Sequence, residues 1–449
     1  MTVAADGRPG GGRTLLDMNG YQWTVLFAAW LGWGFDVFDG LLFNYVAPNC
    51  VPVLLGLKIG SPEARRAMLL WGGILTSLLL VGWGIGGILF GRIADRIGRT
   101  RTLMMTMLVY ALGTAMCAAA PNIWVLMLCR IVASLGIGGE WAAGAAMVAE
   151  VVPEKRRVEA GALLYTSAPF GLFLATFANF QIAGVLLKGS PETSWRFVFL
   201  CGLIPAAVAF VVRLFVREPE RWKQAAAGAT HPRIAELFTP EVRAKTVSGF
   251  SMAVIALITW WGVNAFLPIV SAGLAQVAAK EHGLDRAATL ALVEGWKTKA
   301  TNVFNLGGLI GTLLTVPAAK IMGRRQMFAI YYAASAAAVL AAFGLDLSPE
   351  TRLYMYFFIG LSVFGVFGSF TYYLPELFPT RLRGTGAGFC YNVGRFIAAG
   401  GPFLVGAIAS RGTDSLRSAM QVLFWIGVVP LLGVVLARWA VETRDHTLA

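Results

Sequence analysis

Long apolar runs separated by short polar or charged stretches make up almost the whole chain. A membrane-spanning helix needs about 20 consecutive, mostly apolar residues, and about twelve runs reach that length. We place these spans at residues 21–48, 67–91, 102–120, 122–149, 159–187, 196–216, 246–270, 300–319, 326–345, 351–376, 385–410 and 417–440. The pattern therefore predicts an all-α membrane protein, for which the bilayer is the main solvent.

The predicted spans fall into two groups of six. Between them lies a charged segment that contains His231-Pro232 and is typical of a linker holding at most one amphipathic helix. We divide the chain into an N-terminal tail (1–20), a first half (21–216), a linker (217–245), a second half (246–440) and a C-terminal tail (441–449).

Short motifs of the first half recur in the second half, in the same order and at nearly the same spacing. The matches pair Asn44–Pro48 with Asn264–Pro268, Gly98-Arg99 with Gly323-Arg324, and Glu150, Pro153 and Arg157 with Glu376, Pro379 and Arg383. Repeated halves of this kind are one known design of membrane transporters. The repetition predicts two duplicated halves related by pseudo-symmetry.

The composition supports a membrane protein and argues against an enzyme. Of 449 residues, 57% are hydrophobic and only 14% are charged, whereas a soluble chain has about a quarter charged residues. Most of the cysteines fall within predicted spans, so neither a disulfide framework nor a thiol metal site follows. We find no clustered nucleophile, metal-ligand set or phosphate-binding loop, and expect no cofactor and no metal.

The net charge of +13 raises the question of nucleic-acid binding. When the spans alternate from a cytoplasmic start, however, Lys and Arg are concentrated on the cytoplasmic side. This asymmetry follows the positive-inside rule for membrane proteins. We therefore expect both termini in the cytoplasm, a lipid bilayer as partner and no nucleic acid.

Few ionisable residues lie within the predicted spans: Asp36, Asp39, Arg130, Glu140 and Arg395. Each would cost about 2.5–3.5 kcal/mol at a helix centre on insertion scales. Asp36 and Asp39 share one helix face, and because close carboxylates repel each other, one of them can hold a proton near neutral pH. The pair thus suits proton coupling, with Glu140 as a further candidate; the alternative is a fixed ion pair or a carboxylate facing water.

Arg395 falls near the middle of the eleventh predicted span. A guanidinium can hold a carboxylate through two hydrogen bonds, so Arg395 is a candidate anchor for an anionic substrate; the alternative is a structural ion pair. Aromatic rings could stack on a flat acid and amides could orient it. Candidates of this kind are Tyr165, Trp261, Asn264, Tyr372, Tyr391 and Asn392, although most such side chains in membrane proteins serve packing.

The turn between the second and third predicted spans reads GRIADRIGR, from Gly91 to Arg99. Asp95 beside Arg96 can pair with other charges or with a helix N-terminus, and so hold one gating state; the alternative is a set of ordinary loop charges. Gating candidates are Gly91, Asp95, Arg96, Gly98, Arg99, Glu150, Arg157, Glu376 and Arg383. Glu150 and Glu376 stand at span ends, where pairing with nearby arginines is expected.

This turn resembles the signature loop of the major facilitator superfamily. The segment from Arg130 to Arg157, with glycines that allow close helix contact, resembles its proton-coupled metabolite and sugar-porter branches. The segment from Glu376 to Arg395 is similar to its organic-acid branch. The resemblance implies twelve transmembrane helices in two six-helix pseudo-symmetric halves. It also implies that Asp39 carries the proton, with Arg130 as its partner and Asp36 as an auxiliary, and that Arg395 binds an anion.

Three departures limit the resemblance. Lys320 stands where the second-half counterpart of Asp95 would be, the first span reads Asp-Val-Phe-Asp without the usual Gly, and the seventh span lacks the paired Gln of sugar porters. We expect proton-coupled symport of a small organic acid by alternating access, in a monomer of a prokaryotic inner membrane. Sugar or polyol symport is the alternative, followed by efflux antiport and a nutrient-sensing receptor.

Overall fold

The computed structural model describes residues 18–97, 99–153, 156–214, 233–379 and 382–444, and these are helical with short connections. Within these ranges, side chains are not described at 91–92, 94–96, 99–100, 139–147, 149–150, 157, 205–206, 209 and 212–214. The predicted all-α class is confirmed, because no strand occurs in the described part of the chain.

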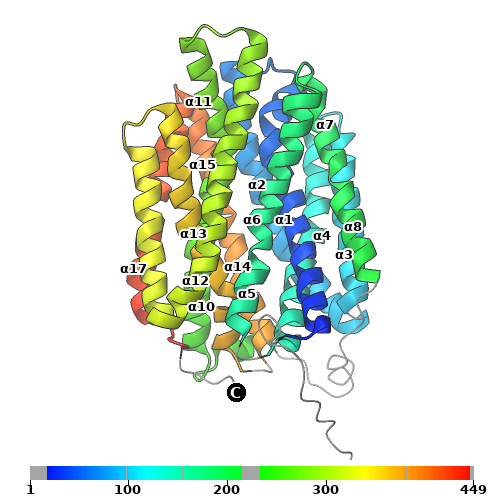
Figure 1. Cartoon of the computed structure of the whole chain (residues 1–449), viewed down its shortest axis with the longest axis vertical. Coiled ribbons are helices and arrows are strands. Elements are labelled where there is room, and N and C mark those ends of the chain that lie inside the picture. Colours follow the sequence, from blue (N-terminus) through cyan, green and yellow to red (C-terminus); the bar gives the residue numbers. More distant parts are fainter. Residues whose placement is uncertain (1–17, 98, 154–155, 215–232, 380–381, 445–449) are drawn as a thin grey trace, which may run out of the picture.

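The first half of the chain forms helices that run back and forth along one long axis (Figure 1). Its elements are α1 (Gly20–Leu54), α2 (Pro62–Ile97), α3 (Arg99–Ala118), α4 (Ile123–Val151), α5 (Arg157–Tyr165), α6 (Ser167–Asn179), the π-helix η3 (Phe180–Leu186), α7 (Pro191–Cys201) and α8 (Leu203–Leu214).

The second half follows a described part of the linker that contains the short 3₁₀ helix η4 (Ile234–Phe238). Its elements are α10 (Arg243–Asn264), α11 (Leu267–Glu281), α12 (Arg286–Gly344), α13 (Pro349–Leu377), α14 (Arg383–Ala398), α15 (Gly400–Arg411), α16 (Ser415–Ile426), α17 (Val429–Leu436) and the 3₁₀ helix η5 (Ala437–Trp439). α12 bends at Gly323, whose φ of 80° is left-handed, and so supplies two spans.

The twelve predicted spans each correspond to a helical rod in the described residues. Five of these rods consist of successive helices with little interruption between them. They are α5–α6–η3, α7–α8, α10–α11, α14–α15 and α16–α17–η5. The predicted boundaries were wrong between the seventh and eighth spans. Residues 271–299 were expected to form mostly a loop, but α11 continues to Glu281 and α12 begins at Arg286.

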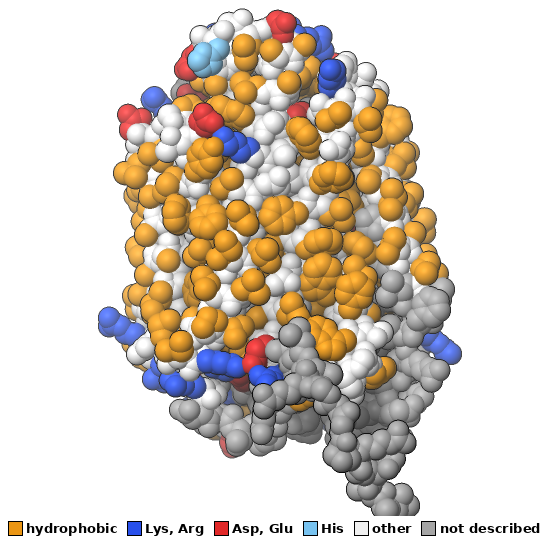
Figure 2. Space-filling view, in the orientation of Figure 1, with side chains coloured by type: hydrophobic (Ala, Val, Ile, Leu, Met, Phe, Trp, Pro, Cys, Tyr) orange, Lys and Arg blue, Asp and Glu red, His pale blue; other side chains and the backbone are white. Residues whose placement is uncertain are grey.

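The outside of the bundle suits a bilayer. Nine helical stretches among the described residues are long and apolar enough to cross a membrane. Figure 2 shows hydrophobic side chains along the middle of one face, with charged side chains gathered at both ends. Large apolar side chains such as Leu112, Ile204 and Ile330 are more than half exposed, which is expected where lipid rather than water surrounds the protein.

The two ends of the bundle differ. α1 begins and η5 ends at the same end, which we call the termini end; the turn between α11 and α12 lies at the opposite end, which we call the hairpin end (Figure 1). All further positions along the bundle are given relative to these two ends.

Two glycines of α4 let this helix pack tightly between α2 and α3. A Cβ on Gly138 would lie 2.0 Å from the carbonyl oxygen of Trp83 in α2, and one on Gly136 would lie 2.7 Å from that of Thr106 in α3. The helix backbones can approach this closely only because no side chain stands between them. The contact fixes Trp83 and its helix α2 against α4.

Glu442 caps the second segment of α12 from a distant part of the sequence. Its carboxylate accepts hydrogen bonds from the backbone N–H groups of Arg324 (2.9 Å), Arg325 (3.1 Å) and Arg444 (3.0 Å). Partial burial raises the pKa of Glu442, but these backbone hydrogen bonds outweigh burial and hold the pKa below its ordinary value. The carboxylate thus satisfies N–H groups that the bend at Gly323 leaves without helical partners.

Replacing Glu442 by Gln should lower the free energy of unfolding at pH 7 by about 1 kcal/mol, the usual loss of a helix cap. A lowered folded-state pKa contributes stability that is fully present above the unfolded-state pKa of about 4.3 and is lost as the pH falls through the folded-state value. In thermal denaturation in detergent, the difference in melting temperature between parent and variant should therefore become smaller as the pH is lowered. Glu241→Gln, at an exposed position, is the control; a difference that does not change with pH would contradict the assignment.

Candidate functional site

Arg395 lies buried on α14, where side chains of both halves surround it. Its guanidinium carbon is 4.4 Å from the centre of the Trp83 ring, which α2 contributes, and 4.5 Å from that of the Tyr391 ring. Nη1 donates a hydrogen bond of 2.7 Å to Oδ1 of Asn392. Aromatic faces attract a cation, so these groups hold a positive charge at the boundary between the two halves. A guanidinium in such a place is suited to bind a carboxylate.

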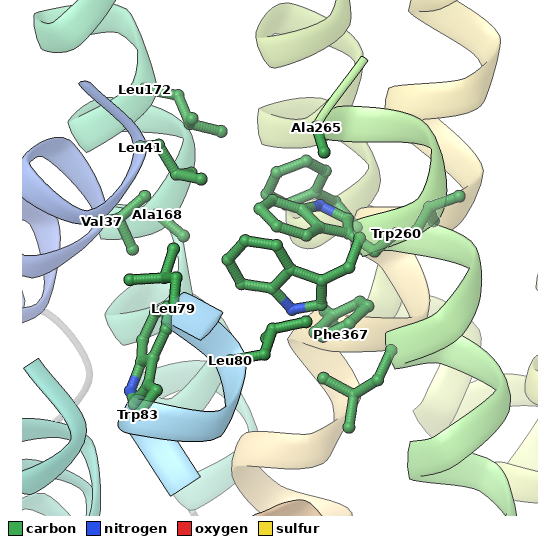
Figure 3. Packing of buried hydrophobic residues seen from close by; sticks show 14 of the residues in the cluster. Val37, Leu41, Leu79, Leu80, Trp83, Ala168, Leu172, Trp260, Ala265 and Phe367 are labelled. Atoms are coloured by element: carbon green, nitrogen blue, oxygen red, sulfur yellow. The ribbon is translucent and has the colours of Figure 1, made fainter. Parts of the chain in front are cut away.

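A set of aromatic side chains extends from Arg395 across the interface, and we call it the aromatic cluster. It consists of Trp33, Trp83, Tyr165, Trp260, Trp261, Phe364, Phe367 and Tyr391. The first three come from the first half and the others from the second. Figure 3 shows the same region, with side chains of α1, α2 and α6 facing Trp260 of α10 and Phe367 of α13.

The contacts within the cluster join the two halves directly. The rings of Trp83 and Trp261 meet edge to face at 5.8 Å, and Tyr165 stacks on Phe367 at 6.2 Å. Such pairs add about 0.5–1.5 kcal/mol each beyond the area that they bury. The flat faces and the cation together form a chemical environment that suits a planar organic anion.

The structure brings together five of the seven predicted substrate-binding residues and sets the other two apart from this network. Arg395, Asn392, Tyr391, Tyr165 and Trp261 belong to the arrangement just described. Asn264 is buried one helical turn beyond Trp261 on α10. Tyr372 instead makes its contacts with Thr315 (3.0 Å) and Met327 (3.4 Å), and Arg324 lies 5.3 Å from its ring.

Asp39 is buried inside the first half, among α1, α3 and α4. Its Oδ2 accepts a hydrogen bond of 2.7 Å from Thr114. No side chain or backbone group of the described residues donates a hydrogen bond to Oδ1. A Cβ on Gly202 would lie 2.7 Å from Oδ1, so this glycine leaves room for the carboxylate. A buried carboxylate with one satisfied oxygen can become neutral by binding a proton.

Arg130 contacts the main chain around Asp39 rather than its carboxylate. Nη1 donates to the carbonyl oxygen of Asp39 at 3.3 Å, and Nη2 donates to that of Gly40. Arg130 therefore lies next to Asp39, but its hydrogen bonds go to two backbone carbonyls of α1. Asp36 is also buried, one turn earlier on α1; the side chain of Glu140 lies outside the described residues.

The gating candidates are described only in the second half. Glu376 accepts hydrogen bonds from Arg324 at 2.8 and 3.2 Å and from Thr443 at 2.6 Å. Arg383 donates to the carbonyl oxygen of Pro375 at 3.2 Å. Glu376 is thus bound to the turn after the eighth span, as expected for a carboxylate at a span end. The remaining gating candidates lie outside what the structure describes. These are Gly98, the surroundings of Gly91, and the side chains of Asp95, Arg96, Arg99, Glu150 and Arg157.

The structure also reveals buried residues that the sequence interpretation missed. Glu294 and Lys297 are 5% and 0% exposed, but they fell in the segment that was expected to be a loop. A polar stripe at helical spacing could have placed them, since buried Thr301, Asn305 and Thr312 follow on the same face. Trp83, Phe364 and Phe367 were missed because their sequence neighbours do not distinguish them from ordinary core aromatics.

Comparison with known proteins places this arrangement in a family. The chain matches the Major Facilitator Superfamily over residues 23–402. It is 30% identical over 403 residues to a cis,cis-muconate transport protein of Acinetobacter baylyi, covering 85% of this chain and 89% of that protein. It is 28% identical over 403 residues to a gentisate transporter of Corynebacterium glutamicum, covering 88% of this chain and 83% of that protein.

A solved structure of a D-xylose-proton symporter has the same fold. The TM-score is 0.72 at 17% sequence identity, with 96% of this chain and 100% of that chain covered. At this identity the likeness concerns the fold alone. It agrees with the arrangement of helical rods described above.

Replacing Arg130 by Met should destabilise the protein by about 1–3 kcal/mol, because the two buried hydrogen bonds from its guanidinium to the carbonyl oxygens of Asp39 and Gly40 would be lost. Thermal denaturation in detergent measures the change. Arg101→Met, at an exposed position of α3, removes a guanidinium without this effect and serves as the control. Equal melting of the parent and the Arg130 variant would show that these hydrogen bonds contribute nothing.

Proposed function

The chain belongs to the major facilitator superfamily and is a transporter rather than an enzyme, and we propose that it carries a small, flat organic acid together with a proton. The observation that carries this proposal is the buried guanidinium of Arg395, held between rings from both halves. A symporter of this fold binds its substrate between its halves. A cation at that boundary selects an anion.

The surroundings of Arg395 favour an unsaturated or aromatic acid. The aromatic cluster offers ring faces, and the Asn392 amide offers polar atoms beside the guanidinium. Gentisate, named for one relative, and muconate, named for another, are both planar acids with conjugated bonds. Their shape and charge agree with the side chains of this site.

We assign proton binding to Asp39. The residue lies within the first half, bound by Thr114 and flanked by the guanidinium of Arg130. Protonation removes a buried negative charge, and the neutral state then costs less to keep away from water. The change at Asp39 acts on α1, which packs against α4 and α6, and so reaches the interface where the substrate binds.

Transport then proceeds by alternating access, in which the halves rock about a site near the middle of the membrane. We infer that the termini end faces the cytoplasm, because Lys and Arg predominate in the sequence segments on that side. Since both halves of one chain build the site, a monomer in the bacterial inner membrane suffices for function.

Uptake of labelled acids into proteoliposomes tests the substrate assignment. Gentisate and cis,cis-muconate should enter under an imposed pH gradient, and Arg395→Gln should raise KM by about 10–100-fold, the loss of about 1.5–3 kcal/mol of charge-assisted hydrogen bonding. Arg417→Gln, at an exposed position of α16, should leave KM unchanged. Uptake of a hexose that does not depend on Arg395 would overturn the organic-acid assignment in favour of sugar symport.

Asp39→Asn tests the coupling separately from binding. The variant cannot take up and release a proton at this position, so accumulation driven by a pH gradient should disappear, while exchange of external for internal acid without a gradient should persist. Asp346→Asn, at an exposed position before α13, should behave like the parent. Gradient-driven accumulation that survives in Asp39→Asn would place the proton elsewhere.

A further inference from the structure

A buried ion pair near the hairpin end takes no part in the site described above. Glu294 and Lys297 stand one turn apart on α12, and Nζ of Lys297 lies 2.7 Å from Oε1 of Glu294. Side chains of this kind are very rarely buried unless they are paired and hydrogen-bonded. Their burial is therefore a feature that needs an explanation.

The partners of this pair come from the other half of the protein. Asn49 of α1 donates to Oε1 of Glu294 at 3.2 Å, and Asn179 of α6 donates to Oε2 at 3.0 Å. Lys297 in turn donates to the carbonyl oxygen of Tyr45 at 3.1 Å. The ion pair lies within one helix, whereas these three hydrogen bonds join the first half to the second.

The backbone of the first half also approaches this point closely. η3 starts directly after Asn179, and a Cβ on its Gly184 would lie 3.4 Å from Cβ of Glu294. α2 and α15 meet more closely still, since a Cβ on Gly406 would lie 2.4 Å from the carbonyl oxygen of Leu69. The hairpin end is therefore closed in this structure by direct contact between the halves.

Further polar contacts between the halves lie at the same end. Arg65 of α2 donates to the Gln276 side chain of α11 at 3.0 Å, and Arg286 of α12 pairs with Glu192 of α7 at 3.1 Å. The second pair is well exposed and contributes little by itself. The hydrogen bonds from Glu294 and Lys297 to the first half are buried, and we expect them to contribute more than this exposed pair.

The same helix also bonds to the first half near the termini end. Lys320 of α12 pairs with Glu159 of α5 at 2.5 Å, and both partners are less buried than Glu294 and Lys297. Lys297 and Lys320 stand roughly 35 Å apart along a helix of this length. α12 thus has charged contacts with the first half at both ends of the transport pathway.

We propose that Asn49, Asn179, Glu294 and Lys297 form the gate that closes the hairpin end. When the halves separate there, Glu294 and Lys297 remain paired on α12. The amides of Asn49 and Asn179 lose their hydrogen bonds to Glu294, the carbonyl of Tyr45 loses its hydrogen bond from Lys297, and water replaces these partners. The contact between Lys320 and Glu159 remains closed during that step. The proposal rests on transport by alternating access, and the side that the gate faces rests on the orientation proposed above; it does not depend on the identity of the substrate.

Thiol labelling without substrate tests the gate. In a chain whose own cysteines are replaced, a cysteine at Thr301 reports opening of the hairpin end, because Thr301 lies one turn beyond Lys297 and touches Thr176 of the first half at 3.3 Å. With Asn49→Ala and Asn179→Ala combined, a membrane-impermeant reagent added from the hairpin side should label this cysteine about tenfold faster, which corresponds to a shift of about 1.4 kcal/mol in the opening equilibrium.

A second reporter separates gating from loosening of the fold. A cysteine at Thr371 of α13, whose side chain lies against Gly161 of α5, should be labelled more slowly from the termini side in the same double variant, because opening of one end closes the other. Lys299→Gln removes an exposed pair with Glu350 inside the second half and should change neither rate. Faster labelling of both reporters, or of neither, would overturn the proposal, whatever the outcome of the uptake experiments.

Discussion

The interior of a bilayer offers no water to satisfy a charge, so the protein itself must hold every charged side chain that its spans bury. Three of the buried cations are held in three different ways. Arg130 donates to two backbone carbonyls of α1, Arg395 lies between aromatic rings and an amide, and Lys297 pairs with a carboxylate on its own helix. The first is fixed to the main chain, whereas the others lie between parts of the protein that move apart in transport.

The roles that we propose for these charges are separated in space. Asp39 and Arg130 lie inside the first half, the aromatic cluster with Arg395 spans both halves, and the pair on α12 contacts the first half near the hairpin end. In the mechanism that we propose, a proton, a substrate and a gate thus act on different contacts of the same helices. α1 takes part in all three regions, since it carries Asp39, Trp33 and Asn49, and a change in any one region acts directly on this helix.

The sequence predicted the helical rods well because the apolar runs are long and their polar interruptions are short. It failed where a span carries polar residues on one face. The stripe from Glu294 to Thr312 lowers the average hydrophobicity at the start of α12, so the eighth span was placed too late and a buried ion pair was assigned to a loop. The helical spacing of these polar residues indicates a span, but a search for unbroken apolar runs does not take spacing into account.

The site was only partly predictable for a different reason. Residue type identified Asp39, Arg130 and Arg395, because any charge in a span is unusual. It did not show that Arg130 binds carbonyl oxygens, since backbone atoms carry no residue identity. Nor did it distinguish Phe367 from Tyr372: both are aromatic residues of α13, but one faces Tyr391 and the other Thr315. Which face of a helix meets which neighbour depends on packing over the whole chain.

The carboxylate of Glu442 bears on how the protein is made. It caps a helix segment that starts at Arg324, 118 residues earlier in the chain. During synthesis the ninth span therefore enters the membrane with the N–H groups of its first turn still without this partner, and they gain it only after the twelfth span has emerged from the ribosome. Until then the second half is an incomplete folding unit, in which a helix inserted early depends on a residue translated much later.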